Sequence, residues 1–120
     1  ILTSYPDYLD IRAFLASTYS WDGKYNKARK EFQYVLNKDD KRKTDWIAYI
    51  KNEQYAEKYY KAFKLVQRSL KIFPNDADLL LLKSKSEFNS ANRADALRTI
   101  KSAAELHPTN DDIKNYKNSS

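Results

Sequence analysis

Small and large apolar residues recur along this chain with a constant period of 34 residues. Ala28, Ala62 and Ala96 form one column of the repeat. Four residues after each alanine stands a large apolar residue, seven after it a smaller one, and twelve after it a residue that stops a helix. Positions i, i+4 and i+7 share one helix face, so each segment is predicted to be a packing helix. The three further columns are Phe32, Val66 and Ile100; Val35, Ser69 and Ala103; and Asp40, Pro74 and Pro108.

A second helical segment is predicted upstream of each packing helix, at roughly Tyr8–Ser20, Asp45–Gln54 and Ala77–Phe88. Pro74 and Pro108 should end the second and third packing helices, because proline lacks an N–H and clashes with the preceding turn. Every repeat is therefore expected to be a helical hairpin. The buried faces of the upstream helices are predicted from Leu15, Ala16 and Tyr19; from Trp46, Tyr49 and Ile50; and from Leu79, Leu80 and Phe88.

Composition supports one helical unit over residues 1–120. One Gly and three Pro are too few turn residues for an all-β chain, and the absence of Cys excludes disulfides and thiolate metal sites. Wholly apolar runs such as Leu79–Leu82 are far short of the roughly 20 residues that cross a bilayer. We therefore expect an all-α domain and no transmembrane segment in this sequence.

Helical hairpins with a 34-residue period resemble the tetratricopeptide repeat (TPR) over almost the whole chain. Gly23 keeps the turn glycine of that family, whereas Glu57 and Ala91 replace it in the later repeats, and Glu53 and Glu87 also depart from its pattern. The resemblance implies three tandem repeats that form a short right-handed solenoid. The implied repeats cover about 9–42, 43–76 and 77–110, followed by a partial capping helix at 111–117.

Solenoid ends need a polar terminal helix or further repeats, so we expect this sequence to be a fragment of a longer protein. The resemblance also implies a concave groove lined by the first helix of each repeat, and hence a partner that is a protein or peptide. Aromatic groove residues are candidate anchors, and groove lysines could pair with a carboxylate. The alternative for Trp21, Tyr55 and Phe88 is hairpin core. The candidate contact residues are Ser17, Trp21, Ile47, Lys51, Gln54, Tyr55, Leu81, Lys85 and Phe88.

Heat-shock co-chaperones with TPR repeats hold a partner's C-terminal carboxylates with Lys, Asn and Arg at set positions. None of those residues is present here, so a two-carboxylate clamp cannot be assembled from matching side chains. The corresponding residues are Ala13, Ser17, Ala48, Asp78 and Leu82.

Two segments, Tyr5–Arg12 and Thr18–Tyr25, resemble the helical N-terminal region of YaiO-type outer-membrane β-barrel proteins. In that family such repeats precede a barrel. The resemblance implies a periplasmic module, associated with the outer membrane, whose β-barrel domain belongs to the same chain. A cytoplasmic location is the alternative.

No catalytic set is visible in the sequence, and we expect no enzyme activity, cofactor or metal. There is a single His, no Cys and no Gly-rich phosphate loop. His107 lies at a predicted helix end, where a cation interacts favourably with the helix dipole. The pairs Asp39/Asp40 and Asp111/Asp112 fall in turns, where carboxylates cap helices more often than they bind hard cations.

Two other functions stay open at this point. The chain carries a net charge of +6, with 10 Tyr, 5 Phe and 2 Trp among its lysines, a combination that could stack RNA bases on a basic surface. Core packing already accounts for most of these tyrosines, which disfavours a nucleic-acid partner. A short solenoid could also act only as a spacer or a dimer contact through an exposed end face. The sequence does not fix the oligomeric state.

Overall fold

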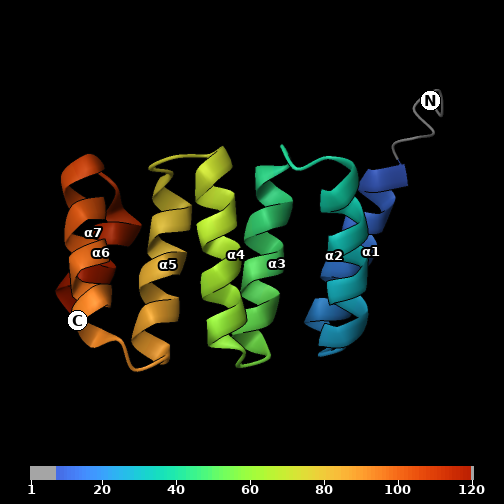
Figure 1. The fold of residues 1–120 in the computed structure, drawn as a ribbon, viewed down its shortest axis with the longest axis horizontal. Coiled ribbons are helices and arrows are strands. Elements are labelled where there is room, and N and C mark those ends of the chain that lie inside the picture. Colours follow the sequence, from blue (N-terminus) through green and yellow to red (C-terminus); the bar gives the residue numbers. More distant parts are fainter. Residues whose placement is uncertain (1–7, 120) are drawn as a thin grey trace.

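The computed structural model describes residues 8–119, and that part of the chain is built from α-helices without any strand (Figure 1). The helices pair along the chain as α1 with α2, α3 with α4 and α5 with α6, and α7 follows the last pair. Their bounds are α1 Tyr8–Trp21, α2 Tyr25–Lys38, α3 Lys43–Tyr55, α4 Tyr59–Ile72, α5 Ala77–Asn89, α6 Arg93–Leu106 and α7 Asp111–Ser119.

The hairpins stack side by side into a short solenoid that measures 45 × 26 × 21 Å. Each helix packs against its neighbours in the chain, and α3 also contacts α1 and α5. The first helices of the three hairpins therefore share one side of the stack, with α1 and α2 at one end and α6 and α7 at the other (Figure 1). The predicted all-α fold of three TPR-like hairpins with a terminal helix is confirmed.

The repeated columns form the core. Ala28, Ala62 and Ala96 are buried, as are the large residues four positions later in each repeat. The Phe32 ring stacks on the Tyr49 ring with centroids 5.6 Å apart, which joins the first repeat to the second. Helices α4 and α6 end two residues before Pro74 and Pro108, as proline requires.

Two residues that we predicted in the core are exposed. Leu15 is 37% exposed, whereas its repeat equivalent Tyr49 is buried against the helix that precedes α3. No described helix precedes α1, so nothing described covers Leu15. Phe88 is 43% exposed, because the nine residues of α7 are too few to cover the last turn of the longer α5.

The three hairpin turns are built alike. Gly23, Glu57 and Ala91 all have positive φ, at 77°, 62° and 67°. The next residue in each turn donates its N–H to a carbonyl five positions earlier at 2.8 Å, a bond that caps the preceding helix. Only glycine adopts this conformation without strain, and a non-glycine residue costs about 1–2 kcal/mol there. The second and third turns therefore carry strain that the first does not.

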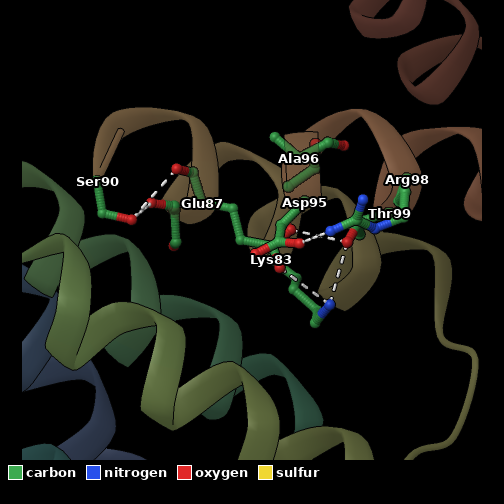
Figure 2. Close-up of polar contacts among 9 residues, drawn as sticks. Lys83, Glu87, Ser90, Asp95, Ala96, Arg98 and Thr99 are labelled. Carbon is green, nitrogen blue, oxygen red and sulfur yellow. Dashed lines mark hydrogen bonds and ion pairs between the residues drawn. The ribbon is translucent and has the colours of Figure 1, made fainter. Parts of the chain in front are cut away.

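The glutamates that depart from the TPR pattern form buried ion pairs. Glu53 accepts two hydrogen bonds at 2.8 Å from the Arg29 guanidinium of the preceding repeat, and this bonding raises the pKa of Arg29. Glu87 accepts bonds from Lys83 at 3.1 Å and from Thr99 at 2.7 Å (Figure 2). The Arg29–Glu53 pair joins two repeats. The Lys83–Glu87 pair lies within α5, and the Thr99 bond joins it to α6 of the same repeat.

Candidate functional site

A hollow of about 420 Å³ opens between α3, α5 and α7 on the side shared by the first helices. Four residues that the sequence assigned to the groove line it together. Ile47 and Lys51 come from α3, and Leu81 and Lys85 come from α5. Asp78, Asp112, Asn115 and Tyr116 complete much of the wall, so this hollow carries both signs of charge.

A larger hollow of about 550 Å³ adjoins the first, and the two share Lys85 and Tyr116. Its apolar wall includes Phe88, Leu97 and Ile100 from α5 and α6. Its ionisable lining consists of two cations and one tyrosine, without any carboxylate. A ligand that combines an apolar group with a neighbouring negative charge matches this lining.

The cations of the larger hollow are available to a ligand. The Arg93 guanidinium lies 5.2 Å from the Phe88 ring centroid, and the Lys85 ammonium lies 5.7 Å from that of Tyr116. Neither cation forms an ion pair with another residue in the part of the chain that the structure describes, and the same holds for Lys51. An unpaired cation beside an aromatic face is well placed to receive a carboxylate.

Tyr116, which was not predicted from the sequence, lines both hollows. Burial raises its pKa, and a hydrogen bond with Ser84 acts in the opposite direction. The 34-residue period contained the signal, because Ile113 and Tyr116 fall in the columns of Leu79 and Leu82. Ile113 is fully buried against α6, as Leu79 is in its own repeat, and it holds α7 in place.

Polar contacts fix the wall between α5 and α6. The Ser84 hydroxyl donates to the Ala96 carbonyl at 2.9 Å, and Lys83, Glu87 and Thr99 form the network drawn in Figure 2. The larger hollow is therefore bounded by two helices that are held in register before any ligand arrives.

The other predicted groove residues lie outside both hollows. Gln54 donates its amide N–H to the Leu82 carbonyl at 3.3 Å and to the Ser86 hydroxyl at 3.0 Å, which joins α3 to α5. Ser17 is half-buried on α1, and Tyr55 is exposed. Trp21 is 75% exposed, so the hairpin-core alternative is wrong for it as well as for Tyr55 and Phe88.

His107, which the sequence places at a helix end, makes a structural contact. The His107 imidazole Nε2 lies 2.6 Å from the Asn75 carbonyl oxygen and ties the end of α6 to the turn before α5. Within residues 8–119, no three His, Asp or Glu side chains gather in a geometry that could hold a metal ion. None of the helices in that range is both long and apolar enough to span a bilayer.

Comparison with known proteins gives a likeness of fold. No protein-family model matches the sequence, and no curated protein matches it. The first TPR domain of Spaghetti (RPAP3), solved with an HSP90 peptide, superposes with a TM-score of 0.79 at 14% identity, over 92% of this chain and 88% of that one.

Two bacterial proteins are similar in the same way. The type III secretion translocator chaperone SycD of Yersinia enterocolitica gives a TM-score of 0.81 at 18% identity, over 94% of this chain and 86% of that one. MamA of AMB-1 gives 0.76 at 19% identity over 91% of this chain, which spans 64% of MamA. At these identities the likeness shows the fold alone: this chain is a short helical-repeat solenoid of the TPR type.

Proposed function

We propose that this protein binds a segment of another protein in the two adjoining hollows lined by α3, α5, α6 and α7. The segment has an apolar side chain that enters the larger hollow and a carboxylate beside it that pairs with Lys85 and Arg93. The protein acts by binding and not by catalysis. A solenoid of the same fold has been solved with a bound peptide, which supports this use of the architecture.

One observation carries the proposal: two unpaired cations and an apolar wall line a single preformed hollow. Lys85 and Arg93 line this hollow together with Phe88, Leu97 and Ile100. No carboxylate lines the same space. The residues that hold the co-chaperone clamp are absent, so the partner would be recognised by one carboxylate and its apolar neighbour. Aromatic and arginine residues are the usual anchors of such contacts.

The test uses a library of short unstructured peptides in which an acidic residue adjoins an apolar one, with both blocked and free C-termini. Binding is followed by amide NMR shifts on the 120-residue chain. We expect shifts centred on Lys85, Arg93 and Tyr116. Lys85→Glu should weaken the best peptide at least tenfold, about 1.4 kcal/mol.

Lys101→Glu is the matched control, because Lys101 is an exposed lysine of α6 outside both hollows. It should leave the affinity within about twofold, ~0.4 kcal/mol. Equal losses in the two variants would mean only a general charge effect. A library without any binder, or shifts confined to other helices, would favour a spacer role or another face.

The cellular setting is a separate proposal, which rests on the YaiO-type resemblance of Tyr5–Arg12 and Thr18–Tyr25. We propose a periplasmic module that is joined to an outer-membrane β-barrel in the same chain. The complete reading frame tests it directly. A signal peptide upstream and a barrel downstream would support it, and a reading frame with neither would exclude it.

RNA binding is the second candidate, because positive charge is concentrated on two second helices. Helix α2 carries four cations and one anion, and α4 carries four cations and no anion. Arg29 is engaged by Glu53, but the other cations of these helices have no ion-pair partner among the described residues. A single-stranded RNA oligonucleotide should then bind with a salt slope of about −0.7 per phosphate contacted. A peptide ligand should show little salt dependence.

A further inference from the structure

The N-terminal end of the solenoid exposes an uncharged apolar face on α1. Ile11, Phe14, Leu15 and Trp21 lie on one arc of this helix, and we name them the α1 stripe. Phe14 is 68% exposed and Ile11 is also largely exposed. The largest apolar patch on a monomer, commonly a few hundred Å², is often an interaction site.

The repeat itself shows how unusual this exposure is. Leu79 and Leu82 of α5 occupy the columns of Ile11 and Phe14, and both are buried where α4 packs on α5. Tyr49 of α3 occupies the column of Leu15 and is buried beside α2. A face that is covered in the second and third repeats is therefore bare in the first, within the part of the chain that the structure describes.

Charge decides against two arrangements for covering the stripe. One arrangement is a helix like α2 packed on the stripe. In α2, Arg29 pairs with the buried carboxylate of Glu53 in the next repeat, but α1 has Tyr19 in the column of Glu53. An end-to-end stack would place the stripe on the outer side of α7, whose exposed residues are polar or charged. Those residues are Asp111, Asp112, Lys114, Asn115, Lys117 and Asn118.

We propose that the α1 stripe pairs with the α1 stripe of a second copy of this chain, and that the two copies form a closed two-fold dimer. Such an interface is self-complementary because each copy supplies the same apolar residues, and it closes without exposing a further stripe. Since an aromatic side chain carries about 150–250 Å² of surface, the stripe offers on the order of 500 Å² per copy. The pair then buries about 1,000 Å², near the lower limit for a specific interface, which predicts a weak, concentration-dependent dimer.

The dimer leaves the larger hollow free, because that hollow is lined by α5, α6 and α7. These helices lie at the other end of the solenoid from α1 (Figure 1). Two grooves in one particle would strengthen binding to a partner that displays two copies of its motif. The inference does not depend on the proposed peptide function, and either can fail without the other.

Sedimentation equilibrium over a concentration series tests the dimer. The apparent mass of the wild-type chain should rise from 14.1 kDa towards twice that value and stop there. Phe14→Asp should keep the chain monomeric at every concentration. Tyr60→Asp is the matched control, because Tyr60 on α4 is also 68% exposed, and it should dimerise like the wild type.

Cysteine crosslinking then locates the interface, since the natural chain has no Cys. Leu15→Cys should form a disulfide-linked dimer on mild oxidation, and Tyr60→Cys should not. A wild-type chain that stays monomeric at its solubility limit would overturn the proposal. So would growth beyond two copies, or dimerisation that Phe14→Asp leaves intact.

Discussion

The first and third repeats have the same hairpin architecture, but the first ends in an exposed apolar surface and the third in a polar one. The third repeat is closed by α7, which buries Ile113 against α6 and turns polar residues to solvent. The first repeat presents the α1 stripe without a described neighbour. The third repeat also holds both cations of the larger hollow, whereas no predicted groove residue of α1 lines either hollow.

This contrast shows that a repeat position acquires its role from its neighbours. The column of Ile11, Leu79 and Ile113 is apolar in each of these helices, yet it is exposed in α1 and buried in α5 and α7. The core spacing is the same throughout, but the end of the stack decides which apolar residues become interaction surface.

The largest expected effect comes from removing the contact that closes the C-terminal end. Ile113→Ala deletes a fully buried side chain and should cost about 2–5 kcal/mol in the free energy of unfolding. Phe14→Ala, at the open end, should change it by less than about 0.5 kcal/mol. Urea denaturation followed by circular dichroism, at concentrations where the chain is monomeric, measures both. Similar losses would mean that the two ends are packed alike.

A smaller effect is expected when the turn residues of the two end repeats are exchanged. Gly23→Ala should destabilise by about 1–2 kcal/mol, because the left-handed backbone there penalises a side chain. A Cβ at this position would meet no heavy atom within 4 Å, so the loss would come from the backbone alone.

Ala91→Gly makes the reverse change at the equivalent turn of the third repeat, where φ is 67°. Relief of backbone strain should outweigh the greater entropy of the unfolded chain, for a gain of about 0.5–1 kcal/mol. Thermal melts of the two single variants and the double variant measure this. A destabilised Ala91→Gly chain would show that the third turn is not strained.

The smallest expected effect is a loss of folding stability at alkaline pH through Tyr116, at the closed end. Burial raises the pKa of Tyr116 above its unfolded value of about 10. The folded state therefore favours the neutral phenol. Its contribution is complete below the unfolded pKa and is lost as the pH rises through the folded pKa.

Tyr116→Phe removes this titration, so the variant should lose less stability than the wild type when unfolding is measured on both sides of pH 10. Tyr60→Phe is the control, because the exposed Tyr60 buries little of its ring on folding. Burial also raises the pKa of Tyr49, so part of the alkaline loss should persist in both variants. An unchanged profile for Tyr116→Phe would show that its hydroxyl stays in solvent.

Much of the fold was predictable because helix packing leaves a periodic signal. The alanine columns and the two prolines located all three hairpins, and each first helix was placed to within two residues at either end. The errors arose where an end interrupts the period. Leu15 and Phe88 fit the helical pattern of a core face, but neither has the neighbour that would bury it.

The candidate site was predictable only in part. Ile47, Lys51, Leu81 and Lys85 were placed in the groove from their repeat positions, and the structure brings them into one hollow. Tyr116 and Arg93 were missed. Tyr116 falls in the column of Leu82 but lies on a short terminal helix, and Arg93 falls in a column that holds Tyr25 and Tyr59 in the earlier repeats. Whether these residues bind a partner is a prediction that the peptide experiment tests.

The sequence by itself determined the helices, their pairing and their order, because apolar periodicity and proline positions are local properties of the chain. The tertiary structure decided which charges are free and which apolar residues are covered. The charge of Glu53 is balanced because α2 brings Arg29 to it from 24 residues away, and Lys85 is available because no acid among the described residues lies near enough to form an ion pair with it. Burial and ion pairing depend on distances between helices, and those distances exist only after the hairpins have stacked.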